Sequence, residues 1–125
     1  MQLASVSFIV PDYDSGIAFF CETLGFDLVS DIEQGHKRWV EVRAPGVATS
    51  VVIARADGPE QQAMIGNQGG GRVWLFLETD DFARDHARLT RHGIVFEETP
   101  RVEPYGTVAV FADPFGNRWD LIQRV

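Results

Sequence analysis

The sequence contains little cysteine, little basic charge and no long apolar run. Among 125 residues there is a single cysteine, Cys21, which excludes an intrachain disulfide and agrees with a reducing compartment. Lysine and arginine total 11 against 18 aspartate and glutamate residues, so the formal net charge is −7. Such an acidic chain disfavours binding to nucleic acid or to an anionic membrane.

The sequence also has no pattern typical of a targeting segment or of a membrane-spanning segment. No apolar run approaches the length that crosses a bilayer, and the first residues lack the basic and apolar segments of a signal peptide. We therefore expect a cytoplasmic protein without a membrane or nucleic-acid partner. The length indicates a single domain over residues 1–125, and 45% hydrophobic residues can form a sizeable core.

The same order of strand and helix signals occurs twice along the chain. In the first half, alternating apolar residues and a helix stripe of Ile17, Phe20 and Leu24 predict a strand at 3–10, a helix from Asp12 or Asp14 to Leu24, and strands at 26–32, 37–43 and 49–55. In the second half, the same signals predict a strand at 72–77, a helix from residues 79–81 to His92, and strands at 94–98, 107–111 and 118–123.

This internal repeat predicts an α+β fold built from two βαβββ modules, residues 1–55 and 72–125. We expect curved mixed sheets that form a cup, with the helices on the outside. Residues 56–71 between the modules are rich in Gly and Gln and end in three glycines, so they are interpreted as a mobile linker with a short helical turn around 61–65.

A turn at 113–117 organises the end of the chain. Asp113 can accept from its own backbone, Pro114 restricts φ, and Gly116 permits a positive φ. In the strand that follows, alternation places Asp120 on the same face as Arg118, among large apolar residues. A carboxylate in that place could be a ligand, an acid or base, or the partner of an arginine.

The repeat and the turn resemble the vicinal oxygen chelate superfamily, also called the glyoxalase/bleomycin-resistance/dioxygenase group. The resemblance is carried by the segments 12–26, 76–94 and 105–117 and spans the whole chain. It implies two βαβββ modules forming a cup. It indicates the fold far more strongly than the reaction, because the superfamily includes isomerases, dioxygenases, thiol transferases and drug-sequestering binders.

Metal-dependent members of this family place ligands at four inner positions, which fall here at Ser5, about Ile53, Arg72 and Asp120. Only Asp120 is of a usual ligand type, so we expect no intact family metal site and no confidently assigned cofactor, with Asp120 as the one candidate ligand if a divalent metal binds. We expect Arg72 and Asp120 to pair instead and to orient an anionic or polar ligand. The alternative is a purely structural salt bridge.

The remaining candidates are the aromatic and polar residues that the family pattern directs into the cup. Candidate ligand-binding residues are Ser5, Trp39, Arg72, Trp74, Phe76, Tyr105 and Arg118. For the aromatic residues, the alternative is a place in the core or in a dimer interface. Candidate catalytic residues are Asp120, Glu41 and Glu103, although a solvated loop is the favoured interpretation for the segment around Glu103.

These residues predict a small-molecule-binding protein of the glyoxalase/bleomycin-resistance type that lacks the usual metal site, and we expect it to be a homodimer. The alternative is an enzyme of the same superfamily, a metal-dependent or acid/base lyase, isomerase or dioxygenase. A protein-interaction module without a ligand is a third interpretation. Cys21 is expected to be an ordinary helix residue and not a nucleophile.

Overall fold

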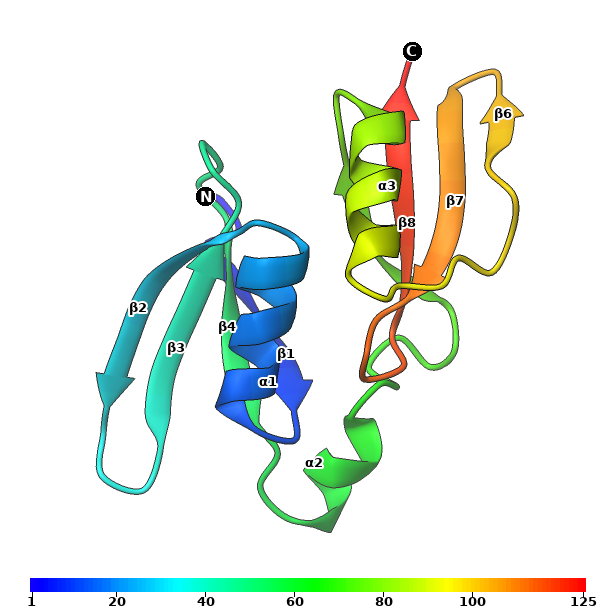
Figure 1. Ribbon diagram of the computed structural model, residues 1–125. Helices are drawn as coiled ribbons and strands as arrows, with labels where there is room; N and C mark the ends of the chain where they lie inside the picture. The colour runs from blue at the N-terminus through cyan, green and yellow to red at the C-terminus, as the bar shows by residue number, and fades with distance from the viewer. The chain divides into compact units, whose positions relative to one another are not determined.

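A computed structural model describes residues 1–125, which divide into two compact units, Met1–Ile65 and Gly66–Val125. Each unit contains a βαβββ module with one four-stranded mixed sheet, so the fold is α+β, as the repeat predicts (Figure 1). None of the helices has the length and apolar character needed to cross a lipid bilayer.

The first unit has the strand order β1-β4-β3-β2, in which β1 and β4 are parallel and the other pairs are antiparallel. Its elements are β1 (Ser5–Val10), α1 (Tyr13–Ile17), the π-helical segment η1 (Ala18–Thr23), β2 (Asp27–Glu33), β3 (Arg38–Arg43), β4 (Ser50–Arg55) and α2 (Pro59–Met64). The second helix, α2, lies where the sequence predicts a helical turn.

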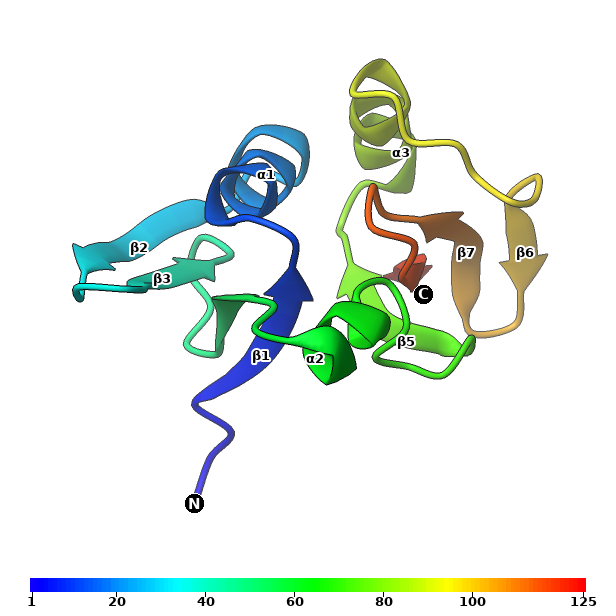
Figure 2. The same cartoon turned by 90° about the horizontal axis from the view of Figure 1, so that it is seen from below.

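The second unit repeats this topology with the order β5-β8-β7-β6, and β5 and β8 are its parallel pair. Its elements are β5 (Val73–Glu78), α3 (Phe82–Arg91), β6 (Arg101–Glu103), β7 (Gly106–Ala112) and β8 (Arg118–Arg124). In each module one helix lies on one face of the sheet, as the view from below shows (Figure 2). The opposite face of each sheet has no helix of its own module, and we call it the helix-free face.

The core of the first module lies between its sheet and α1–η1. Alternation along β1 buries Phe8 and Val10 completely, and the ring of Phe8 meets the ring of Phe20 edge-on at 5.0 Å. Gly16 allows α1 to approach closely, because a Cβ there would lie 2.7 Å from Cγ2 of Ile53. Burial of this apolar face holds the helix, since α1 alone is far too short to be stable in water.

The predicted stripe of Ile17, Phe20 and Leu24 is only partly correct. The chain changes from α-helix to π-helix at Ala18, and the N–H of Leu24 donates to the carbonyl of Phe19 at 3.0 Å. A π-turn contains more residues than an α-turn and rotates the following side chains around the axis. Phe19, Phe20 and Thr23 are therefore the buried residues of this segment, whereas Ile17 and Leu24 are only half-buried.

An aromatic row fills the helix-covered side of the second module. His86 of α3 stacks on Phe96 at 4.0 Å, Phe96 meets Phe111 edge-on at 5.5 Å, and Phe111 stacks on Trp119 at 5.8 Å. Leu89 of α3 is buried on the same side. Such pairs stabilise a core by about 0.5–1.5 kcal/mol beyond the area they bury.

The strand predicted at 94–98 is wrong. Only Phe96 forms a β-bridge there, with Phe111, and the edge strand next to β7 is β6, closer to the Gly106 turn. Phe96 is tied to the aromatic row, and Pro100, which lacks a backbone N–H, separates this bridge from β6. The segment 94–98 therefore pairs with β7 only around this bridge and forms no strand.

The 113–117 turn is built on one buried carboxylate. Oδ1 of Asp113 accepts from the backbone N–H groups of Phe115, Gly116 and Asn117 at 2.9, 2.9 and 3.0 Å. Its Oδ2 accepts from Nδ2 of Asn117 at 3.0 Å and from Nε1 of Trp119 at 2.9 Å. The side chain thus closes the turn and fixes the indole that anchors β8.

We expect Asp113→Ala to destabilise the protein by about 3 kcal/mol, because it leaves buried N–H donors without an acceptor. Urea unfolding followed by tryptophan fluorescence measures the loss. Asp27→Ala is the control, since Asp27 is exposed at the start of β2 and its loss should change little. Equal losses in the two variants would contradict this role of the turn.

Gly66 and Gly70 allow a second test, because both have a positive φ, at 71° and 65°. A Cβ on Gly66 would lie 1.9 Å from the carbonyl oxygen of Phe115, whereas a Cβ on Gly70 would meet nothing within 4 Å. We expect Gly70→Ala to cost about 1 kcal/mol from backbone strain alone. Gly66→Ala should cost at least about 3 kcal/mol because the turn must also move. Similar unfolding midpoints would show that Gly66 does not support the turn.

Candidate functional site

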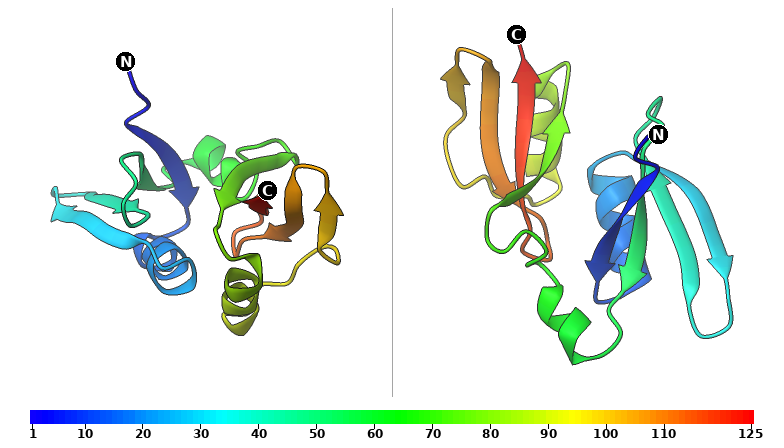
Figure 3. Two further views of the ribbon diagram at one scale, coloured as in Figure 1. Left: turned by 90° about the horizontal axis from the view of Figure 1, so that it is seen from above. Right: turned by 180° about the vertical axis from the view of Figure 1, so that it is seen from behind.

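Strand alternation places most of the predicted site residues on the helix-free faces. In the second module these are Phe76 of β5, Glu103 of β6, and Arg118 and Asp120 of β8. In the first module they are Ser5 of β1, and Trp39 and Glu41 of β3. In the view from behind, the sheet of the second module lies in front of its helix α3, so its helix-free face is towards the viewer (Figure 3, right).

Asp120 occupies the middle of the second sheet, where Phe76 of β5 and Val110 of β7 are its strand neighbours. Its Oδ1 is buried and has no hydrogen-bond partner. Burial raises the pKa of this carboxyl above its usual value, and Glu98 also raises it, whereas the charges of Arg101 and Arg118 lower it. Asp120 is thus a partly dehydrated acceptor that no protein donor satisfies.

An ion-pair network borders Asp120 on the β6–β7 side. Arg101 pairs with Glu98 through Nε and with Glu103 through Nη1, the latter at 3.0 Å. Hydrogen bonds to Glu98, to Glu103 and to the Tyr105 hydroxyl raise the pKa of Arg101. Two of the predicted residues, Glu103 and Tyr105, therefore meet at one arginine. The group of Glu98, Arg101, Glu103, Tyr105 and Asp120 is called the Asp120 patch.

The predicted ion pair between Arg72 and Asp120 is wrong. Arg72 lies one residue before β5, is exposed, and forms no ion pair. Arg118, which lies on the same strand as Asp120, does not pair with it either. Its guanidinium pairs with Glu97 at 2.8 Å and donates to the carbonyl of Gly71 at 3.2 Å. Asp120 is consequently left without a salt bridge.

Glu41 is the polar centre of the helix-free face in the first module. Its Oε2 accepts from the Ser50 hydroxyl at 2.6 Å, and its Oε1 accepts from Nε1 of Trp39 at 3.3 Å. Ser5 lies beside Ser50 across the β1–β4 pair. Of the three residues predicted in this module, Trp39 and Glu41 are hydrogen-bonded to each other, and Ser5 lies beside the serine that bonds Glu41.

Several of the predicted aromatic residues are too exposed to be core. Phe76, Tyr105 and Trp39 have 64%, 47% and 40% of their surfaces accessible. Trp74 is half-buried and packs on Gly69, where an added Cβ would lie 2.6 Å from Cβ of Trp74. Exposed aromatic rings near polar groups provide apolar area for an organic ligand.

The residues at the family's metal positions do not fit a metal ion. Ile53 is 1% exposed and lies on the helix-covered face. Shifting the register by one places Val52 or Ala54 on the helix-free face, and neither can ligate. Arg72 would add positive charge where a cation should bind. No group of three or more His, Cys, Asp or Glu side chains converges in the structure, so we derive no chemistry through a metal.

Sequence reasoning missed Arg101, Glu98 and Ser50. The sequence predicts strands at 94–98 and 107–111, and Arg101 lies between these two ranges. Its alternation with Glu103 just before the Gly106 turn was the signal for β6. Ser50 lies within the strand predicted at 49–55, and its alternation with Val52 indicates the helix-free face. Cys21 carries no sign of nucleophilic activation, because burial, Asp27 and Glu22 all raise the pKa of its thiol.

Comparison with known proteins finds similar chains over the full length. An uncharacterised protein of Shewanella frigidimarina (strain NCIMB 400) is 50% identical, over 98% of this chain and 93% of that protein. A glyoxalase/bleomycin resistance protein from Streptomyces sp. CB03234 is 34% identical, with a TM-score of 0.73 over 98% of this chain and 100% of that one.

TnmS3, an antibiotic binding protein from the same Streptomyces strain, is 33% identical, with a TM-score of 0.80 over 100% of this chain and 97% of that one. The model of the Glyoxalase/Bleomycin resistance protein/Dioxygenase superfamily matches residues 2–121. Together with the repeated βαβββ modules, this match identifies the chain as a member of that superfamily.

Proposed function

We propose that this protein binds a small organic molecule on the helix-free face of its second module without using a metal ion. The observation that carries the proposal is Asp120, whose buried Oδ1 lacks any donor. An unsatisfied buried acceptor is costly, and a ligand N–H or O–H would remove that cost. We also propose that the protein acts in the cytoplasm as a homodimer, as expected from the sequence.

The surroundings of Asp120 favour a ligand with an aromatic part. Phe76, its neighbour across the β5–β8 pair, is largely exposed, and so is Tyr105 beside Arg101. A ring stacked on Phe76 with a donor directed at Asp120 would use both groups. The similarity to an antibiotic binding protein supports a ligand of this kind. The ion pairs of Arg101 then act as the rigid border of the Asp120 patch.

One observation favours an enzyme as the second candidate. The pKa of Asp120 is raised, and carboxyl groups that transfer protons in enzymes commonly have a raised pKa. In that case Asp120 would exchange a proton with a bound substrate, and the Arg101–Glu103 ion pair would border it. The sequence candidate Glu41 is bonded within the first module by Ser50 and Trp39, which suits a structural or ligand-positioning role.

A thermal-shift screen of planar aromatic antibiotics and of divalent metals tests the binding proposal. We expect an organic compound to stabilise the protein, and Asp120→Ala to weaken its binding by about 10- to 100-fold through loss of a charged hydrogen bond. The matched control is Glu78→Ala, which removes an exposed acid on the same sheet that pairs only with Arg124 at 3.4 Å.

Failure of every organic compound to bind would contradict the proposal. Unchanged affinity in Asp120→Ala would remove Asp120 from the site. A stoichiometric metal that is lost in Asp120→Ala would favour the enzyme alternative instead.

The raised pKa of Asp120 also predicts a pH-dependent stability. A carboxyl with a raised folded-state pKa contributes stability below its unfolded value, near 3.8, and that contribution is lost as pH rises through the folded value. Asp120→Asn should therefore be more stable than the wild type at pH 7. Solvent screening of this half-exposed group limits the gain to on the order of 1 kcal/mol or less.

Urea unfolding of both proteins between pH 3 and pH 7 measures this difference. The gain should shrink as the pH is lowered towards 3. A variant that is less stable than the wild type at pH 7 would show that the Asp120 carboxylate is stabilised by its surroundings.

A further inference from the structure

The sheet of the first module splits at one end into two ribbons. The pairing of β3 with β4 stops at Val40 and Ile53. Beyond this point β3 continues to pair with β2, and β4 continues to pair with β1, up to Arg38 and Arg55 respectively. The divergence opens a cavity of about 440 Å³ between β3 and β4. This cavity, which we call the β3–β4 slot, has the size of a small-metabolite site.

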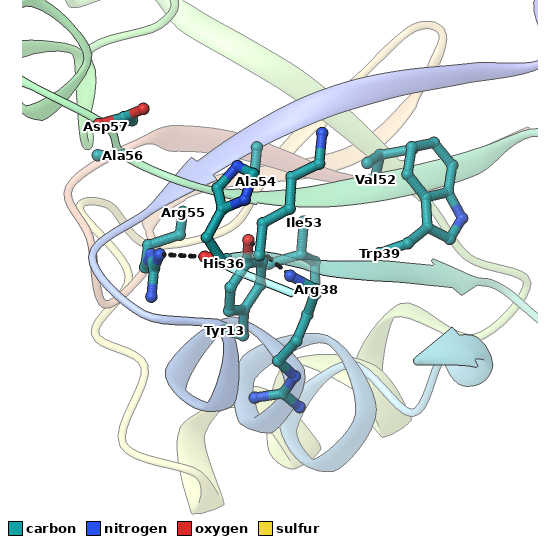
Figure 4. Close-up of a pocket in the computed structure, with 11 residues that line it drawn as sticks. Tyr13, His36, Arg38, Trp39, Val52, Ile53, Ala54, Arg55, Ala56 and Asp57 are labelled. Carbon is teal, nitrogen blue, oxygen red and sulfur yellow. Dashed lines mark hydrogen bonds between the residues drawn. The ribbon is translucent and has the colours of Figure 1, made fainter. Parts of the chain in front are cut away.

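Tyr13 of α1 lies at the base of the slot, as Figure 4 shows. Its side chain is buried, and its hydroxyl oxygen accepts the backbone N–H of Arg38 at 3.2 Å. That N–H belongs to a strand residue that has no partner on β4. A phenol has one proton to donate in addition to accepting, and no acceptor in the protein takes this proton. The floor of the slot therefore offers a buried donor.

Positive charge at the slot is only partly neutralised. The guanidinium groups of Arg38 and Arg55 both lie over the Tyr13 ring, at 5.2 and 5.4 Å from its centroid. Arg38 is paired with Asp31 and with Asp14. Arg55 has no carboxylate partner and donates only to the carbonyl of His36 at 3.1 Å. Its remaining N–H groups are free for a ligand.

Lys37 adds a second unpaired cation to the lining. It is exposed and forms no ion pair. Asp57, the one carboxylate among the lining residues, is exposed and pairs with neither Lys37 nor Arg55. The slot therefore holds two cations, Lys37 and Arg55, that no carboxylate neutralises, although the net charge of the chain is −7.

We propose that the β3–β4 slot binds the oxyanion group, carboxylate or phosphate, of a small aromatic molecule. Arg55 and Lys37 neutralise the anion, and the Tyr13 hydroxyl donates to one of its oxygens. The exposed indole of Trp39 and the side chain of Val52 lie at the other end of the slot and pack against the ring (Figure 4). The site uses residues of the first module only and does not depend on Asp120.

Titrations with benzoate and with phenyl phosphate, followed by backbone amide NMR at low salt, test this site. We expect saturable shifts around Tyr13 and Arg55 with a Kd on the order of 1 mM, as suits fragments of this size. Benzyl alcohol, which lacks the charge, should not bind. The ratio of the two affinities tells whether a carboxylate or a phosphate is preferred.

Arg55→Gln should weaken the binding of both anions about tenfold, and Tyr13→Phe should weaken it by a smaller factor. Arg91→Gln is the charge-matched control, because Arg91 is exposed at the end of α3 and should leave the affinity unchanged. If Arg55→Gln does not fold, Lys37→Gln still tests the site, because the Lys37 side chain is exposed and its replacement breaks no ion pair.

Equal affinity in Arg55→Gln, Lys37→Gln and Arg91→Gln would overturn the proposal. Shifts confined to residues outside the slot, or no saturable shift with either anion, would overturn it as well.

Discussion

One constraint decides the environment of the side chains on both sheets: each four-stranded sheet carries a single helix of its own module, and that helix covers only one face. Strand alternation then divides the residues into a set that packs against the helix and a set that does not. Phe8 and Val10 on one sheet, and Phe111 and Trp119 on the other, belong to the first set. The polar and half-exposed aromatic residues belong to the second set. The candidate site follows from this division.

The helix-free faces carry carboxylates that are held in very different ways. Glu41 is bonded by a serine and an indole within the first module. Glu103 is held by Arg101, whereas Asp120 is left with an unsatisfied oxygen and a raised pKa. The two arginines near Asp120, Arg101 and Arg118, both pair with glutamates instead, so a partner outside the chain best explains the unsatisfied oxygen of Asp120. That argument leads to the small-molecule proposal.

The β3–β4 slot has the opposite electrostatic character. There a cation, Arg55, lacks a carboxylate, although Arg38 beside it has two. Both places combine an uncompensated polar group with exposed aromatic surface, which is the usual composition of a ligand site. They differ in the ligand group that each would bind: a hydrogen-bond donor at Asp120 and an anion at the slot. Separate ligand panels can therefore distinguish them.

The sequence by itself determined the α+β class, the repeated βαβββ order, the turn built on Asp113 and the face of nearly every predicted site residue, because hydrophobic period and turn chemistry are local properties. It did not determine which ions pair. The family pattern matched Arg72 with Asp120, yet the arginines whose charges act on Asp120 are Arg118 of the same strand and Arg101, which β6 brings close because it forms at 101–103. The sequence did not predict the β3–β4 slot either, because the slot depends on where β3 and β4 cease to pair and on Tyr13 beneath them. Such contacts join residues far apart in the chain, and only the packed tertiary structure decides them.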